Sequence, residues 1–231
     1  DFGTKYLIKN FPKSQTASPK FGRIMGDTNR GHFDADLFRE VDFNQNQIWQ
    51  KELSTKQKNK YETLSRKAYL DSVFAKIETM CQKIDKNEPI ILMDLHDTGN
   101  KLLGKNTNED HLRSEFIMPT AIFSNQKDQT SNHKFLQNVS HKFSDAFKTD
   151  NSKIKLNTFF YGGFITQFFG GVKTNPRLEK IFKKYNRSHN SLLVVQCELN
   201  RDLYLDEKNQ KIRPEIGRIR TNFENFIQAI A

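Results

Sequence analysis

The chain is poor in cysteine, and it contains no long hydrophobic run. Its two cysteines, Cys81 and Cys197, lie far apart, which excludes a disulfide scaffold and a cysteine-rich zinc site. We expect both thiols to be free and buried, and we expect a cytoplasmic protein. Residues 156–172 come nearest to a transmembrane helix, but they include four glycines and several polar side chains. We therefore predict no membrane segment, and the N-terminus shows no signal peptide.

Acidic residues are outnumbered by basic ones, with 27 Asp and Glu against 37 Lys and Arg and a net charge of +10. Such a charge can attract nucleic acid, anionic membranes or acidic metabolites. The lysines are spread along the chain, however, and no basic run is interleaved with aromatic residues. No zinc-finger or RNA-recognition signature is present either. We interpret the charge as a general compositional bias and predict neither a nucleic-acid nor a membrane partner.

Apolar residues make up only 35 % of the chain, but they include 20 phenylalanines, which is enough for a core. No linker rich in proline, glycine or serine divides the sequence, and no internal repeat is visible. We therefore predict a single domain over residues 1–231.

Hydrophobic periodicity predicts helices that alternate with strands. The helices are expected over residues 55–86, 132–148, 176–185 and 214–230. Strands are expected over residues 21–25, 90–95, 116–123 (interrupted by Pro119), 154–160 and 192–199. This alternation indicates an α/β fold, a three-layer sandwich with a mostly parallel central sheet.

In such sheets, functional side chains gather at the carboxyl ends of the strands. That rule selects His96, residues 27–30, and Glu198 within the last strand. We expect these three parts of the chain to lie at one edge of the sheet.

His96 and Glu198 each have a functional and a structural interpretation. A neutral imidazole at a strand end is a good zinc ligand, and Asp94 or Asp97 could fix its tautomer. An acid in an apolar strand is costly unless it is paired or bound to metal, and burial would raise its pKa toward that of a general base. The alternatives are a structural or surface histidine, and a glutamate that faces solvent or pairs with Arg201.

Arg30 and the glycine pair Gly162–Gly163 are weaker candidates. A guanidinium at Arg30 could hold a substrate carboxylate, with Asn29 adding an amide. The alternative is a surface ion pair of Arg30. Gly162 and Gly163 allow a ligand-binding turn or simply a tight strand-to-helix turn. No phosphate-binding loop, dinucleotide fingerprint or nucleophile elbow is present, so a serine or cysteine nucleophile has no support.

Several short segments, in order along the chain, carry a resemblance to a known family. They are residues 27–30 (DTNR), 94–96 (DLH), 161–166 (YGGFIT), 195–201 (VQCELNR) and 203–207 (LYLDE). Each is short, but their order and spacing agree over most of residues 21–207. In these segments the chain resembles the N-formylglutamate amidohydrolase family, which is similar to zinc carboxypeptidases and aspartoacylases in fold and site plan.

The resemblance implies metal-assisted hydrolysis of an amide on a zinc-exopeptidase-like (phosphorylase/hydrolase-like) fold. Zinc polarises a carbonyl and lowers the pKa of a bound water. By this resemblance His96 would be a metal ligand and Glu198 the general base that activates the water.

The same resemblance implies a substrate site. Asn29 and Arg30 would bind a substrate carboxylate, and the turn formed by Tyr161, Gly162 and Gly163 would line the pocket.

One element of the family pattern is missing. The family has an early Pro-His-Ser/Ala-Gly segment whose histidine binds the metal, followed by an acidic ligand. The segment Asp1-Phe2-Gly3 resembles the acidic part, so Asp1 would be a second ligand of the Zn²⁺ and a further histidine is expected upstream of Asp1. Either the chain lacks its natural N-terminal segment, or the protein is a homologue without a complete zinc site. We favour the first, because the segment begins in the middle of the pattern.

The sequence thus predicts a zinc-dependent amidohydrolase that removes a formyl-like acyl group from a small acidic N-acyl amino acid. One alternative is an inactive homologue of the same fold that serves as a binding domain. A basic nucleic-acid-binding protein is the less favoured alternative.

Overall fold

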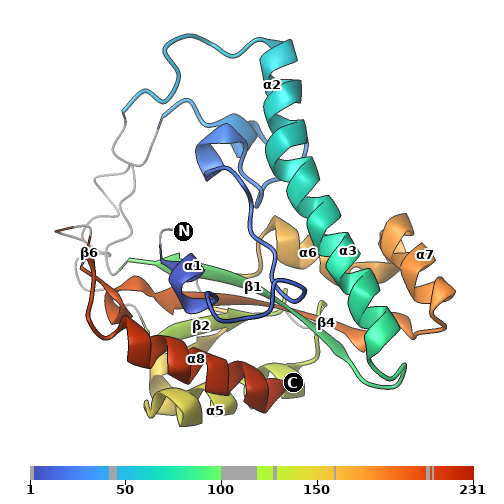
Figure 1. The fold of residues 1–231 in the computed structure, drawn as a ribbon, viewed down its shortest axis with the longest axis vertical. Helices are drawn as coiled ribbons and strands as arrows, with labels where there is room; N and C mark the ends of the chain where they lie inside the picture. Colours follow the sequence, from blue (N-terminus) through green and yellow to red (C-terminus); the bar gives the residue numbers. More distant parts are fainter. Residues whose placement is uncertain are drawn as a thin grey trace.

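A mixed β-sheet forms the centre of the molecule, and helices cover both of its faces (Figure 1). The computed structural model describes residues 3–41, 46–99, 119–126, 129–158, 160–206, 209 and 211–231. Four strands lie in the order β1-β4-β2-β3. They are β1 (Ile90–Thr98), β2 (Ala121–Ser124), β3 (Ile154–Leu156) and β4 (Leu192–Asn200). A separate antiparallel pair joins β5 (Leu205–Asp206) and β6 (Lys211–Ile212).

The sheet is mostly parallel, as the sequence predicts. β1 pairs with β4 and β2 pairs with β3 in parallel, whereas β2 runs antiparallel to β4. β1 continues to Thr98, beyond the apolar run that predicts it. β3 is shorter than the strand expected over residues 154–160. Residues 116–118, expected in a strand, lie outside the described residues.

The prediction of a strand over residues 21–25 is wrong. Arg23–Met25 forms the 3₁₀ helix η1. Its backbone groups bond locally, since the amides of Met25 and Gly26 donate to the carbonyls of Gly22 and Arg23. Without a neighbouring strand to pair with, a stretch this short satisfies its polar backbone in a turn.

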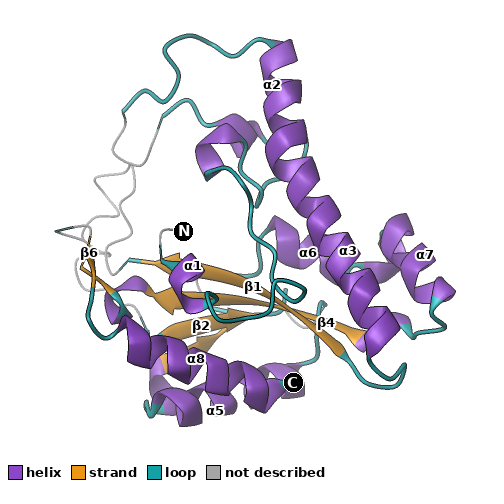
Figure 2. Ribbon diagram, viewed as in Figure 1, coloured by secondary structure: helices purple, strands orange, loops and turns teal. Residues whose placement is uncertain are grey.

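The predicted three layers are present (Figure 2). One face of the sheet packs against α1 (Thr4–Leu7), α5 (His133–Phe147) and α8 (Ile216–Ile230). The other face packs against α3 (Ala68–Lys83), α6 (Phe164–Gly170) and α7 (Pro176–Lys184). α6 was not expected, because its short run follows two glycines and shows little helical periodicity.

The long helix expected over residues 55–86 is present but is interrupted. It consists of α2 (Thr55–Glu62), the π-helical turn η3 (Thr63–Lys67) and α3. Ser54 caps it in a capping box with Gln57. Leu64 is one of the apolar positions whose spacing predicts this helix and would lie on its buried side, but it is 42 % exposed. The wider π turn changes the helical phase and places Ser65 and Arg66 on the buried side instead.

Short 3₁₀ helices complete the connections. Besides η1 they are η2 (Ala35–Phe38), η4 (Asn151–Lys153), η5 (Val172–Thr174), η6 (His189–Ser191) and η7 (Arg201–Leu203).

Both cysteines are free and buried, as predicted. Among the described residues, no helix has the length and apolar character needed to span a membrane.

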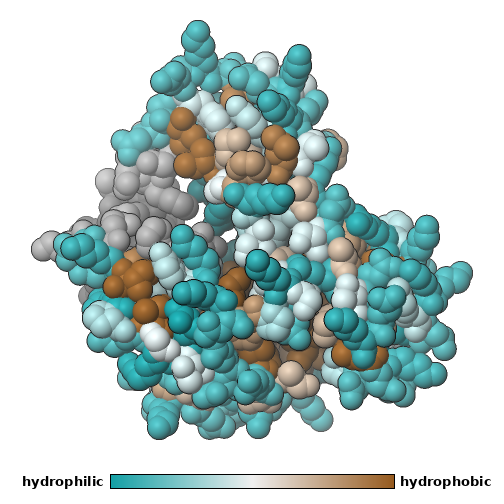
Figure 3. Space-filling model, viewed as in Figure 1, coloured by the Kyte–Doolittle hydropathy of each residue, from teal (hydrophilic) through white to brown (hydrophobic). Residues whose placement is uncertain are grey.

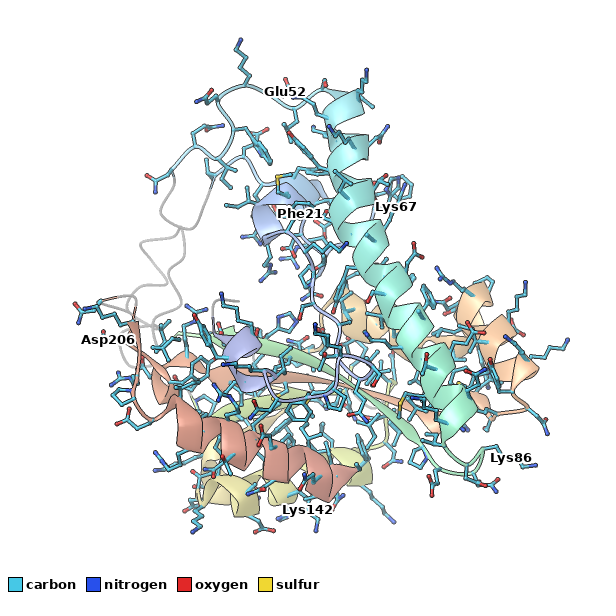
Figure 4. The ribbon with its side chains drawn as sticks, viewed as in Figure 1. Phe21, Glu52, Lys67, Lys86, Lys142 and Asp206 are labelled. Atoms are coloured by element: carbon cyan, nitrogen blue, oxygen red, sulfur yellow. The ribbon has the colours of Figure 1, made fainter. Side chains whose placement is uncertain are left out.

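The segment that carries η1, η2 and α2 stands away from the sheet and exposes apolar side chains (Figure 3). Of the described residues, the large apolar side chains that are exposed are Phe21, Ile24, Phe33, Leu64 and Tyr161. The stick view shows Phe21 and Lys67 in this upper part of the molecule, and Lys86 at the turn that leads into β1 (Figure 4).

Candidate active site

On the face that packs against α3 and α6, the side chains of the β1–β4 pair change from apolar to polar along the strands. Toward the amino ends of the strands this face is apolar and carries Ile90, Leu92, Leu192 and Val194. Toward the carboxyl ends, Asp94 pairs in register with Gln196, and His96 pairs with Glu198. All four of these polar residues are buried. The two strands therefore bring the predicted ligand and the predicted base side by side.

His96 is held by a carboxylate. Its Nε2 lies 3.0 Å from Oδ1 of Asp94, and Oδ2 of Asp94 accepts a 3.2 Å hydrogen bond from the Thr166 hydroxyl. Burial lowers the pKa of His96, but the carboxylates of Asp94 and Glu198 outweigh this effect and raise the pKa above its ordinary value. His96 lies inside β1 and not after it, so its orientation is fixed by the strand.

Glu198 accepts hydrogen bonds on both of its carboxylate oxygens. Thr98 donates to Oε2 over 2.9 Å, and the Gln196 side chain donates to Oε1 over 2.7 Å. Burial raises the pKa of Glu198, against the opposing effects of the His96 charge and the two hydrogen bonds. The alternative pairing with Arg201 is wrong, because Arg201 binds Asp97.

The predicted turn at Gly162 and Gly163 reaches this cluster. The backbone N–H of Gly163 donates to Oε1 of Gln196. Gly162 adopts φ +85°, which favours glycine. A Cβ on Gly163 would lie 2.4 Å from Nδ2 of Asn29, so the Asn29 side chain would have to shift to admit any larger residue there. The neighbouring Tyr161 is partly exposed at 48 %.

Asn29 joins the same cluster, whereas Arg30 turns away from it. Nδ2 of Asn29 lies 3.5 Å from Nε2 of His96, and Oδ1 accepts from the backbone N–H of Ile165 over 3.2 Å. The Arg30 guanidinium donates to the Asn29 carbonyl and lies 3.7 Å from Asp34. The ion pair named above as the alternative for Arg30 is therefore present.

The loop that carries Asn29 is held against the π turn. The Ser65 hydroxyl donates to the Met25 carbonyl over 3.2 Å, and Nε of Arg66 donates to the Arg30 carbonyl over 2.8 Å. The Arg66 guanidinium also lies over the Phe164 ring at the start of α6. The interruption in the long helix thus fixes the position of the loop.

Sequence reasoning did not select Arg23. Its guanidinium forms two contacts with buried Asp27, at 2.9 and 2.8 Å, and Asp27 also accepts from the backbone N–H of Asn29. The positive charge of Arg23 lies close enough to His96 to lower the pKa of His96, although this effect is smaller than that of the carboxylates. Arg23 precedes Asn29 closely in the sequence, but only the folded chain places its guanidinium near His96.

Asp97 belongs to the opposite face of the sheet. Its Oδ2 accepts from the Gly3 backbone N–H over 2.9 Å and from the Tyr204 hydroxyl over 2.8 Å. Its Oδ1 accepts from Nε of Arg201 over 2.8 Å. Asp97 therefore ties the N-terminal segment to β1 and does not contact His96 as Asp94 does. Asp1, the predicted second ligand, lies outside the described residues.

His96 is the one predicted metal ligand that lies among the described residues. His96 has the carboxylate partner that metal-binding histidines commonly use, and Glu198 is its neighbour. Within the described part of the chain, no group of three His, Cys, Asp or Glu side chains is placed to hold an ion. His96, supported by the Asp94 carboxylate, would fit the role of one metal ligand. Glu198 would fit the role of the general base.

Comparison with known proteins gives a fold. No family model matches the chain, and no curated protein matches it. The solved N-formylglutamate amidohydrolase of Ralstonia eutropha is similar, with a TM-score of 0.61 and 13 % identity over 84 % of this chain. This chain spans 60 % of the length of that protein. A gene product of Agrobacterium tumefaciens is also similar, with a TM-score of 0.53, 15 % identity and coverage of 91 % of this chain and 69 % of that one. The α/β architecture is thus the one that N-formylglutamate amidohydrolase has.

Proposed function

We propose that the protein is a metal-dependent amidohydrolase that removes a formyl-like acyl group from a small acidic N-acyl amino acid. The observation that carries this proposal is the register of β1 and β4, which sets buried His96 beside buried Glu198. The similarity in fold to an N-formylglutamate amidohydrolase supports the same reaction class. We further propose a cytoplasmic location and no nucleic-acid partner.

Glu198 is suited to act as the general base. Its raised pKa lies closer to neutrality than that of an exposed glutamate, which makes its carboxylate a better proton acceptor. It would take a proton from the attacking water and later deliver it to the amine that leaves. The surrounding burial keeps bulk water away from this exchange.

We propose His96 as a ligand of a Zn²⁺ ion, with Asp94 fixing the orientation of the imidazole. When bound, such an ion polarises the amide carbonyl and makes a water acidic. Asp1 and a histidine upstream of it are the further ligands that the family resemblance implies.

A guanidinium near the His96 cluster suits an anionic substrate. Asn29 and the turn at Tyr161, Gly162 and Gly163 border the cluster, as expected for a substrate-binding surface. Arg23 adds a guanidinium near His96. We therefore propose that Arg23 contributes to binding the substrate carboxylate, together with Arg30, for which the family resemblance implies this role.

The test measures metal content and formate release in the full-length encoded protein. With N-formyl-L-glutamate and Zn²⁺ supplied, the wild type is expected to hold a stoichiometric ion and release formate. His96→Ala is expected to lose both. His141→Ala changes an exposed histidine on α5 and serves as the matched control. A wild type that holds no metal and releases no formate would contradict the proposal and favour a binding domain of the same fold.

A further inference from the structure

A buried ion pair lies behind the loop over residues 26–32, which we call the Asn29 loop. Nη1 of Arg66 donates to Oε1 of Glu62 over 2.8 Å, and the two side chains are 9 % and 3 % exposed. The π turn η3 places Arg66 on the buried side of the helix. An ion pair buried in this way is often no more stabilising than apolar side chains of similar size. What distinguishes this pair is the set of groups that it holds.

The Arg66 guanidinium binds two partners through two different nitrogens. Nη1 donates to Glu62, and Nε donates to the backbone carbonyl of Arg30 over 2.8 Å. The guanidinium also lies over the Phe164 ring, with Cζ 4.8 Å from the ring centre. Because a guanidinium is planar and rigid, its contacts with Glu62 and Phe164 fix the direction in which Nε donates. Arg66 therefore sets the position of the Arg30 carbonyl relative to α6.

Glu62 holds the same loop at a second point. Nδ1 of His32 lies 2.8 and 2.9 Å from the two carboxylate oxygens of Glu62. An ionised carboxylate can only accept hydrogen bonds, so His32 donates through Nδ1. Gly31 lies between the two points, where a Cβ would be 3.8 Å from the Phe164 ring. The Glu62–Arg66 pair thus holds the loop on both sides of Gly31.

The residue before Arg30 reaches the candidate active site. Oδ1 of Asn29 accepts from the backbone N–H of Ile165 over 3.2 Å, and Nδ2 lies 3.5 Å from Nε2 of His96. Ile165 follows Phe164 directly, so Asn29 and Arg66 contact neighbouring residues of α6. The peptide that joins Asn29 to Arg30 is therefore fixed by the Asn29 side chain at one end and by Arg66 at the other.

We propose that Arg66 positions the Asn29 loop for substrate binding, and that Glu62 holds the Arg66 guanidinium in the orientation this requires. The inference rests on the proposed function, in which Asn29 and Arg30 bind the substrate carboxylate. Arg66 and Glu62 are positioning residues, because they act through the loop and not on the reacting atoms. Their loss is expected to change KM more than kcat.

The first variant separates the two hydrogen bonds of Arg66. In Arg66→Lys a positive charge remains near Glu62, but a CH₂ group takes the place of Nε, so the donor to the Arg30 carbonyl is lost. KM for N-formyl-L-glutamate is expected to rise about tenfold, with kcat within about twofold of wild type. Arg177→Lys is the matched control, because Arg177 on α7 also pairs with a carboxylate and lies over a phenyl ring, both on α3. The control is expected to keep the KM of wild type.

A second variant removes the pair without leaving a buried charge unpaired. Glu62→Met combined with Arg66→Met replaces both charged side chains with apolar ones of similar length, so the protein is expected to fold. KM is expected to rise at least as much as in Arg66→Lys, because both holding points of the loop are lost. Asp71→Asn combined with Arg177→Met removes the exposed ion pair between α3 and α7 and is the control.

The position of the loop is also measured without turnover. The backbone N–H of Arg30 donates to the Asp27 carbonyl over 3.0 Å, within the loop. Hydrogen exchange of the Arg30 amide is expected to be about tenfold faster in Arg66→Lys than in wild type. The amide of Val194 in β4, which donates to the Thr130 carbonyl, reports on the fold as a whole and is expected to exchange at an unchanged rate.

The outcomes distinguish this inference from the proposed function. If the variants exchange and turn over like wild type, the role of Arg66 is overturned and the hydrolase remains. A fall in kcat with an unchanged KM would also overturn that role, and so would loss of folding in both variants, since the pair would then serve the fold alone. A wild type without any hydrolysis would overturn the proposed function, and the substrate-binding role of the loop with it.

Discussion

The two halves of the β1–β4 surface that faces α3 and α6 are similarly buried and chemically opposite. The apolar half consists of Ile90, Leu92, Leu192 and Val194. The polar half consists of Asp94, His96, Gln196 and Glu198. Burial of the first half stabilises the fold by about 25 cal/mol for each Å² of apolar surface. Burial of the second half costs free energy that its internal hydrogen bonds only partly offset. One pair of strands thus carries apolar packing at one end and the proposed catalytic residues at the other.

The largest effect in this comparison is expected from a cavity in the apolar half. Leu192→Ala removes a side chain that is 4 % exposed, so the free energy of unfolding is expected to fall by about 2–5 kcal/mol. Urea denaturation measures this change. The kcat of the folded fraction should stay near that of wild type. A large drop in kcat without a loss of stability would show that the two halves are not separate in function.

The next effect has the opposite sign. Glu198→Gln replaces a buried acid with a neutral group of the same shape, so the free energy of unfolding is expected to rise by about 1 kcal/mol at neutral pH. Glu179→Gln on α7 changes an exposed acid and is the control, with little change expected. If Glu198→Gln is clearly less stable than wild type, the polar half contributes to stability and the contrast between the halves fails.

An effect of similar size concerns the cations at the edge of the polar half. Arg23→Ala removes the guanidinium near His96, and KM for N-formyl-L-glutamate is expected to rise about tenfold with a smaller change in kcat. The Arg30 side chain turns away from the His96 cluster, so Arg30→Ala is expected to raise KM less. Steady-state kinetics of both variants measure the difference. The reverse ranking would assign the substrate carboxylate to Arg30.

The smallest effect is a dependence of stability on pH. The pKa of Glu198 is raised, so the native state holds that proton more tightly than the unfolded chain does. The native state therefore loses stability as pH rises from 4.5, the ordinary value for glutamate, through the raised pKa. The stability advantage of Glu198→Gln over wild type should widen across this range. Urea denaturation between about pH 4 and about pH 8 measures it, and a constant difference would contradict the raised pKa.

The apolar half could be predicted from the sequence. Mostly apolar runs over residues 90–95 and 192–199 indicate buried strands, and the structure has them. The long amphipathic helices could also be predicted, because the spacing of their apolar residues is a local property of the sequence.

The polar half could be predicted only in part. His96 and Glu198 were selected because they lie at the carboxyl ends of predicted strands, and Glu198 also because an acid in an apolar strand is costly. Thr98 was missed because its contact with Glu198 depends on the register between strands about a hundred residues apart, which no local pattern specifies. Gln196 was missed because it also binds the turn at Gly163, which only the folded chain brings to β4. Arg23 was missed because the π turn holds the segment that carries it, and no helical periodicity predicts that turn. In the π turn Ser65 is buried and Leu64 is exposed, the reverse of an ideal helix.

Turnover of N-formyl-L-glutamate by Glu198→Gln in the full-length, metal-loaded protein decides whether Glu198 is the general base. We predict that kcat falls by about 10²–10⁴-fold, while the bound metal and the folded structure are retained. A Glu198→Gln protein that releases formate as fast as wild type would contradict the pairing of His96 and Glu198 as a hydrolytic centre.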